Sequence, residues 1–299
     1  MISTDKLLFW VRSLIRRLLS ILKRRKPFPE PEPTPPPESP RPAAIAWRVF
    51  GVAVQGSSHE RFGIPCQDAC EWKSTTDGTL VVAVADGAGS AKHSAVGAQT
   101  AVRVVIDYLA DSDRLQKVNS ETSWDVLAKE TLQTVLASIQ TEAKSRDSSV
   151  KEFATTLLFA VLGPDWIAAC QIGDGAIVIR DSSKQLQVLT RPVSGEHVNE
   201  TVFVTSMSAV SSAQIVFREF LVSHLCIFTD GLQMLALQMP KAFPHAPFFE
   251  ALFNFVDSED ASVEKLESFL QSRRIRERTD DDITLVLARR CEYEGQSAQ

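Results

Sequence analysis

Cysteine is scarce in this chain of 299 residues, and its five copies are scattered over positions 66, 70, 170, 226 and 291. So few cysteines exclude a disulfide-stapled scaffold and favour a cytoplasmic location for the main domain. Cys66 and Cys70 have the spacing of half a zinc site, but no second Cys or His pair follows at a suitable distance. The Cys and His residues also show no arrangement that calls for a covalent nucleophile.

Long uninterrupted apolar runs are missing as well. Residues 5–26 carry apolar side chains at helical spacing, but Arg12, Arg16 and Arg17 interrupt them, so the segment is too charged to span a bilayer. It also lacks the apolar centre and the cleavage site of a secretory signal. We therefore expect a basic amphipathic helix over residues 1–26. Two roles stay open for it: a peripheral contact with the inner membrane surface, or docking on a partner or on the protein's own body.

Positive charge is outnumbered by negative charge in the rest of the chain. Residues 1–26 hold eight Lys and Arg against one Asp, a net charge of +7. Because the whole chain carries −5, the remaining residues carry −12. This balance excludes nucleic-acid binding by the main domain, which would need a basic face. An acidic body is compatible with a cation site.

Composition divides the chain into four parts. A proline-rich linker follows the basic helix over residues 27–44 and is expected to be extended, at about 3.1 Å per residue. It would hold the body away from whatever the basic helix contacts. The body is expected over residues 45–291, and residues 292–299 would form a flexible tail.

The body contains both strand and helix patterns. Consecutive strands without intervening helices are predicted over residues 154–190 and 214–229, which favours antiparallel sheets. Helices predicted at 93–110 and 121–145 have apolar faces that need a sheet to cover. We therefore expect an α+β layered sandwich.

Three apolar, β-rich stretches run directly into Asp-Gly, at residues 80–87, 168–175 and 225–231. A strand that ends in a carboxylate carries that group, rigidly aimed, to the rim of its sheet. Several such ends on one rim would form an oxygen-ligand site for a hard divalent cation such as Mg²⁺ or Mn²⁺. The pattern predicts metal-assisted hydrolysis of a phosphate ester.

Asp-Gly is also a favoured hairpin turn, and this alternative applies differently to each case. At Asp174 a strand, Gly-Asp-Gly and a second strand follow one another, so the turn is favoured over a direct role. Asp86 and Asp230 each precede a predicted helix, which excludes a hairpin. The run Asp280-Asp281-Asp282 precedes the last strand, and three adjacent carboxylates repel one another unless a cation relieves them. A solvated turn is the alternative for that run.

The order of these motifs resembles one known family. Along the chain they are Gln67-Asp68-Ala69, Ala85-Asp86-Gly87-Ala88-Gly89-Ser90, Ala154-Thr155-Thr156-Leu157, Ile172-Gly173-Asp174-Gly175, Thr229-Asp230-Gly231 and Asp281-Asp282-Ile283-Thr284. Together they resemble the metal-dependent type 2C serine/threonine protein phosphatases, in particular a bacterial branch. The resemblance covers about residues 48–290 and implies a four-layer α-β-β-α sandwich of two antiparallel sheets flanked by helices.

The resemblance also implies a site with two Mn²⁺ or Mg²⁺ ions. By position, Asp86 matches the carboxylate that bridges both ions, and Gly87 matches a carbonyl ligand of the first. Asp230 and Asp281 match ligands of the second ion, and Asp68 matches a ligand that acts directly or through water. The implied reaction is hydrolysis of phosphoserine and phosphothreonine in proteins by water activated between the ions, with Asp86 and Asp230 in catalytic roles. The implied partners are a phosphorylated protein substrate and a cognate Ser/Thr kinase.

The chain departs from the family pattern at several positions. Gln67 stands where many members have Glu, and Ala88 stands where many have a His that serves as general acid. His59, His93 or a water could supply that proton instead. The family's phosphate-binding Arg usually lies a few residues before the first Asp, and Arg61 is the nearest candidate.

Two further points concern the metal ligands. Some bacterial members bind a third cation, to which Glu152 or Asp174 could contribute here. Asp282 replaces the usual Asn and leaves the register of ligands in 280–282 open by one residue.

A second hypothesis is a catalytically inactive phosphatase-like domain that binds phosphoproteins or acts as a scaffold. The missing Glu and His side chains favour it. Retention of Asp68, Asp86, Asp230 and Asp281 favours the enzyme, because a decaying site would lose carboxylates early.

Overall fold

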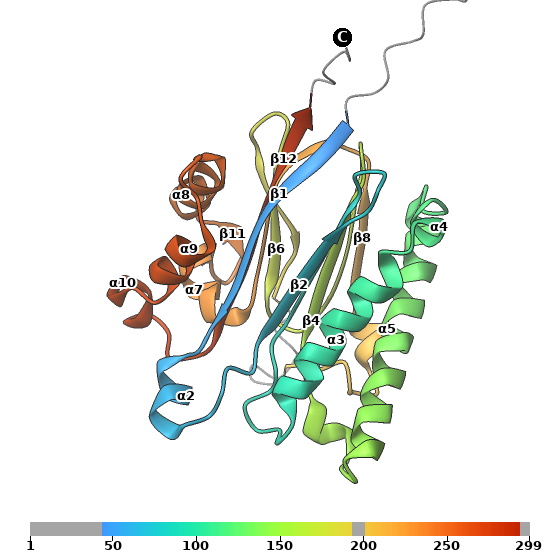
Figure 1. Ribbon diagram of the computed structural model, residues 1–299, viewed down its shortest axis with the longest axis vertical. Coiled ribbons are helices and arrows are strands. Elements are labelled where there is room, and N and C mark those ends of the chain that lie inside the picture. The colour runs from blue at the N-terminus through green and yellow to red at the C-terminus, as the bar shows by residue number, and fades with distance from the viewer. Residues whose placement is uncertain (1–43, 193–200, 294–299) are drawn as a thin grey trace, which may run out of the picture. The chain divides into compact units, whose positions relative to one another are not determined.

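The computed structural model describes residues 44–192 and 201–293 (Figure 1). The predicted basic helix, nearly all of the predicted linker and most of the predicted tail lie outside the described residues. Ala44, expected in the linker, is the first residue of β1, and Glu292 and Tyr293, expected in the tail, continue β12. In the part of the chain that the structure describes, no helix is long and apolar enough to cross a membrane.

Two five-stranded antiparallel sheets form the centre of the fold. The first sheet has the order β1 (Ala44–Val54), β12 (Ile283–Tyr293), β9 (Val222–Phe228), β6 (Ala176–Asp181) and β7 (Leu186–Thr190). The second has the order β2 (Ala69–Ser74), β3 (Leu80–Ala85), β4 (Leu157–Leu162), β5 (Ile167–Ile172) and β8 (Gln214–Arg218). A short pair, β10 (Leu237–Gln238) and β11 (Phe243–Pro244), lies outside both.

Helices cover the outer face of each sheet, as Figure 1 shows. The second sheet packs against α3 (Ser94–Leu109) and α5 (Glu121–Ser145). The first packs against α7 (Gln233–Ala236), α8 (Ala246–Asp257), α9 (Val263–Leu270) and α10 (Arg273–Arg276). The shorter elements are α2 (Ser57–Phe62), α4 (Ser112–Leu115), η1 (Val150–Phe153), α6 (Ala209–Ser212) and η2 (Asp230–Leu232). The expected sandwich of two antiparallel sheets with flanking helices is confirmed.

The three large apolar cores of the described residues explain the layering. One lies between the two sheets, and the other two lie between each sheet and its helices. Central strands such as β3 and β4 are therefore buried on both faces, which is why they read as continuous apolar runs rather than alternating ones. Trp124 of α5 is fully buried, and its indole nitrogen donates a hydrogen bond to Ala169 O at 3.0 Å.

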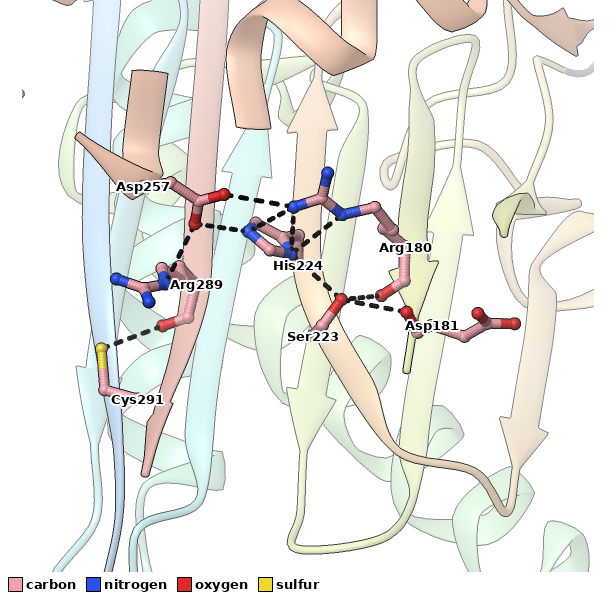
Figure 2. A network of polar contacts seen from close by, with 7 residues as sticks. All are labelled: Arg180, Asp181, Ser223, His224, Asp257, Arg289 and Cys291. Atoms are coloured by element: carbon pink, nitrogen blue, oxygen red, sulfur yellow. Dashed lines mark hydrogen bonds and ion pairs between the residues drawn. The ribbon is translucent and has the colours of Figure 1, made fainter. Parts of the chain in front are cut away.

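A polar network joins the end of α8 to the first sheet (Figure 2). Asp257 accepts from His224 Nε2 at 2.9 Å and pairs with Arg289 Nε at 3.0 Å and Arg180 Nη2 at 3.3 Å. Burial lowers the pKa of His224, so its imidazole stays neutral near pH 7. His224 lies six residues before Asp230, roughly 20 Å along an extended strand, so this network supports the fold at a distance from the Asp-Gly end.

Candidate active site

Strand ends from both sheets bring three carboxylates together. Asp86 follows β3, Asp174 follows β5, and Asp230 follows β9. One carboxylate oxygen from each lies within 4.8 Å of the other two. The structure therefore unites the predicted residues Asp86 and Asp230. It adds Asp174, for which the sequence favoured a hairpin turn.

The turn at Asp174 is held by buried hydrogen bonds. The side-chain amide of Gln171 donates to the carbonyl oxygens of Gly173 and Gly175, at 3.1 and 2.7 Å. Thr201 Oγ1 donates to Asp174 Oδ2 at 2.8 Å. The predicted hairpin is wrong, because β5 lies in the second sheet and β6 in the first. Asp174 instead lies in the connection that crosses between the sheets, and it is part of the cluster. Its position after a buried apolar strand is the same signal that identified Asp86 and Asp230.

Two more carboxylates lie close enough to act on the cluster. The negative charges of Asp68 and Asp281 both raise the pKa of Asp86, after desolvation, which is the largest cause. Asp68 is buried, and its Oδ2 accepts from Thr229 Oγ1 at 2.9 Å. Its Oδ1 is buried with no hydrogen-bond partner among the described residues. That orphaned oxygen is free to accept from a water or to bind a cation.

The cluster is electrostatically overcrowded. Burial raises the pKa of Asp68 to about 7, and burial together with the charges of Asp174 and Asp281 raises that of Asp230 to about 7. Burial also raises the pKa of Asp281. Two ionised carboxylates no more than 4.8 Å apart repel each other by at least about 3 kcal/mol at an effective dielectric constant of 20. A neutral hydrogen bond returns only about 1 kcal/mol, so hydroxyl donors alone do not offset this repulsion.

The donor set fits a hard divalent cation. The groups that converge are carboxylate oxygens, which Mg²⁺ and Mn²⁺ prefer. Gly87 allows close packing beside Asp86, because a Cβ there would lie 2.7 Å from Gln67 O and 2.8 Å from the backbone of Ser94. Among the described residues, no hydrogen bond reaches the carbonyl oxygen of Gly87. Its predicted role as a ligand remains a prediction.

The backbone of Asp86 is fixed by the two threonines of the third motif. Thr155 Oγ1 and the backbone N–H of Thr156 both donate to Asp86 O, at 2.9 and 2.8 Å. The backbone N–H of Asp86 donates to Thr156 Oγ1 at 2.9 Å. These contacts fit a structural role for the threonines beside the carboxylate.

Within the run 280–282, Asp282 joins separate segments of the chain. It is 2% exposed and accepts from the backbone N–H groups of Gly56 and Gln67, at 2.7 and 2.6 Å. His59 Nδ1 lies 2.9 Å from its Oδ2. Because its oxygens are occupied in this way, Asp281 is the carboxylate of the run that acts on Asp86.

Replacing Asp282 by Ala is expected to destabilise the protein by about 2–4 kcal/mol, because two buried backbone donors lose their acceptor. Thermal unfolding measures the effect, expected as a fall in Tm of roughly 5–12 °C. Asp280→Ala is the matched control, since that neighbour is exposed. Equal stability of the two variants would contradict the bracing role of Asp282.

The remaining candidate residues make their contacts with groups other than the cluster carboxylates. Arg61 is exposed on α2, and its guanidinium lies 6.0 Å from the ring of Phe62. No contact between Arg61 and a cluster carboxylate is present among residues 44–192 and 201–293. Glu152 accepts from the backbone N–H of Lys92 at 2.9 Å. The ring of His93 packs against Phe153, with 5.0 Å between centroids.

Thr229 is the residue that the sequence reasoning missed. Its hydroxyl donates to Asp68 and accepts from the backbone N–H of Thr284, both at 2.9 Å. It thereby links the end of β9 to the start of β12 and orients Asp68. The only sequence signal was its place directly before Asp230-Gly231.

Comparison with known proteins agrees with this geometry. A family model described as protein phosphatase 2C matches residues 55–271. Serine/threonine-protein phosphatase 3 of Escherichia coli (strain K12) is 36% identical over 253 residues, which cover 82% of this chain and 98% of that protein.

Solved structures share the fold at lower identity. Serine/threonine phosphatase Stp1 from Staphylococcus aureus matches with a TM-score of 0.58 at 12% identity, covering 85% of this chain and 98% of its own. The catalytic domain of the serine/threonine protein phosphatase PstP, solved with two manganese ions, matches with a TM-score of 0.56 at 14% identity. That match covers 83% of this chain and 100% of the PstP chain.

Proposed function

The chain belongs to the protein phosphatase 2C family, and on that premise we propose that it hydrolyses phosphoserine and phosphothreonine in proteins at the rim where both sheets end. The observation that carries this proposal is the meeting of Asp86, Asp174 and Asp230, whose oxygens lie within 4.8 Å of one another. The family is metal-dependent, and a protein phosphatase acts on phosphoproteins. A cognate Ser/Thr kinase would supply the substrate.

We propose that two ions, Mn²⁺ or Mg²⁺, are held by Asp86 and Asp230, with Asp68, Asp281 and the Gly87 carbonyl as further ligands. Asp174 is the better placed of the two candidates for a third ion, because Glu152 bonds to Lys92 instead. Ions bound in such a site supply Lewis-acid stabilisation of phosphoryl charge and make water a stronger acid.

The protein's own residues would hold this site rigid. Thr155 and Thr156 fix the backbone of Asp86, and Thr229 orients Asp68. Preorganised ligands lose little freedom when substrate binds, which favours the transition state. Arg61 is proposed to bind the substrate phosphate. It stands on α2, which is joined to the Asp282 segment through the 2.9 Å bond from Ser58 N to Asp280 O.

Metal dependence tests the proposed function. The full-length protein, stripped with a chelator, is expected to hydrolyse p-nitrophenyl phosphate and a phosphothreonine peptide at least about 100-fold faster once Mn²⁺ is restored. A Mg²⁺ series identifies the preferred ion. If Mn²⁺ binds but neither substrate is hydrolysed, the chain is the inactive, phosphoprotein-binding alternative, which Gln67 and Ala88 favour.

Two further proposals concern the location of the protein and the role of residues 5–26, which lie outside the described part of the chain. We propose that the protein is cytoplasmic and that residues 5–26 contact the inner membrane surface, because they combine a +7 charge over residues 1–26 with an apolar helical face. Wild type should sediment with vesicles that contain anionic lipid. The double variant Arg16→Glu/Arg17→Glu should bind these vesicles several-fold more weakly. Absence of wild type from the pellet would rule the contact out.

A further inference from the structure

A groove of about 460 Å³ lies among α7, α8, α9 and α10. Its apolar lining includes Leu235, Phe248 and Phe269, and Met234 at its edge is 73% exposed. Figure 1 shows these four helices together on the outer side of the first sheet. Apolar side chains left open in this way are unusual on a well-packed helical layer and are typical of a binding surface.

The groove and the carboxylate cluster are only a few residues apart along the chain. Met234 follows Asp230 by four residues through η2 and α7, a helical path of roughly 6–8 Å. On the other side, Arg278 precedes Asp281 by three residues, at most about 11 Å even if the chain were extended. Both walls of the groove are therefore connected through short segments to carboxylates of the candidate site.

The charge of the groove is opposite to that of the body. Arg273 is paired with Glu277 at 2.6 Å, and Arg276 is paired with Glu60. Arg274 and Arg278 are exposed, line the groove and have no carboxylate partner among the described residues.

Arg274 lies in α10 and Arg278 lies in the turn that follows it, and both line the groove. The described residues that line the groove include neither Asp nor Glu. An anionic ligand is therefore the complement of this surface.

We propose that this groove binds the substrate segment beside the phosphorylated residue, with an apolar side chain among Met234, Leu235 and Phe248 and an acidic side chain at Arg274 and Arg278. The proposal rests on the proposed phosphatase function. Groove contacts three to four residues from the phosphothreonine would need a reach of about 10–13 Å, at about 3.3 Å per extended residue. The enzyme would then prefer phosphosites flanked by Leu-like and acidic residues. Without the two arginines, the acidic body would repel the acidic flanking residues.

The test measures kcat and KM of the Mn²⁺-loaded full-length protein on matched phosphothreonine peptides. Two peptides carry Leu and Glu three and four residues before, or after, the phosphothreonine, and each has a partner with Ala and Gln instead. The variants are Arg274→Glu/Arg278→Glu, and Ala251→Trp, which fills the groove from an exposed position of α8. Arg273→Glu is the matched control on the same helix, because its side chain is 90% exposed and is absent from the groove lining.

Wild type should prefer at least one Leu-Glu peptide by roughly fivefold or more in kcat/KM, mainly through KM. The double variant and Ala251→Trp should lose that preference, while Arg273→Glu keeps it and all four proteins hydrolyse p-nitrophenyl phosphate equally. No preference in wild type, or a preference that survives the double variant, overturns the proposal and leaves the phosphatase function intact. If wild type hydrolyses none of these substrates, the proposed phosphatase function itself is wrong. A change in oligomeric state of the double variant by sedimentation velocity would assign the groove to a second copy instead.

Discussion

Replacing Asp86 by Asn is expected to lower phosphatase turnover by at least about 10²–10³-fold, because this carboxylate belongs to the cluster that is proposed to hold the metal ions. Four other acidic residues, Asp68, Asp230, Asp281 and Asp174, contribute to its raised pKa, so its oxygens face more negative charge than a hydrogen bond can offset. The measurement is Mn²⁺-dependent hydrolysis of p-nitrophenyl phosphate, with Mn²⁺ binding followed by calorimetry. The variant should bind Mn²⁺ much more weakly than wild type.

Asp107→Asn is the matched control, because this residue is exposed on α3 and its change removes the same charge. It should leave activity and Mn²⁺ binding as they are in wild type. Asp230→Asn should resemble Asp86→Asn. Asp174→Asn should cost less, because one oxygen of Asp174 is already engaged by Thr201. Activity within tenfold of wild type in Asp86→Asn would show that the metal ligands lie elsewhere.

The strand ends explain why so much of this site could be predicted from sequence. Residues 80–85 are apolar at every position because β3 is buried on both faces, and the polar residue that follows must leave the sheet at its rim. The same reasoning holds for the end of β9. The order of buried strands and carboxylates therefore predicted both the layered fold and the meeting of Asp86 with Asp230.

Asp174 illustrates what local sequence leaves open. Its flanking glycines and strands are those of a hairpin, but no hairpin forms between β5 and β6. β5 pairs with β4 and β8 in the second sheet, and β6 pairs with β7 and β9 in the first, so the chain crosses from one sheet to the other at Asp174. Whether a turn residue also acts in a site depends on which other strand ends share its rim. That is set by the order of strands in the two sheets, which local patterns do not encode.

The register of the acidic run was open for a similar reason. Neighbouring side chains just before a strand point in different directions, so Asp281 and Asp282 take different roles. The choice follows from the pairing of β12 with β1, in which Ile283 lies opposite Val54. Asp282 is thereby directed to the backbone of Gly56 and Gln67. The position of the Arg61 side chain could not be predicted for a different reason: a long exposed side chain on a short helix is not positioned by packing.

The metal-free protein is expected to lose stability as the pH rises from about 4 to above 7. The pKa values of Asp68 and Asp230 are raised from 3.8 to about 7, so across this interval the folded state binds more protons than the unfolded state. The stability of the folded state therefore falls as the pH rises. The stabilisation that Asp68 and Asp230 provide at low pH is fully lost above pH 7. The lowered pKa of His224 acts in the opposite direction below its ordinary value of 6.5, but it is one group against several carboxylates.

Mn²⁺ should reverse this loss, since a cation that binds only the folded state stabilises it by about 2.7 kcal/mol at 100 times its dissociation constant. In chelator, Tm should be higher at pH 5.5 than at pH 7.5, and saturating Mn²⁺ at pH 7.5 should raise it by roughly 5–10 °C. Asp68→Asn should raise the Tm of the metal-free protein at pH 7.5 and flatten its pH dependence, whereas Asp107→Asn should change neither. A metal-free protein whose Tm rises steadily from pH 5.5 to 7.5 would mean that the buried carboxylates are neutralised within the chain. In that case repulsion among them would no longer be a reason for the site to bind a cation.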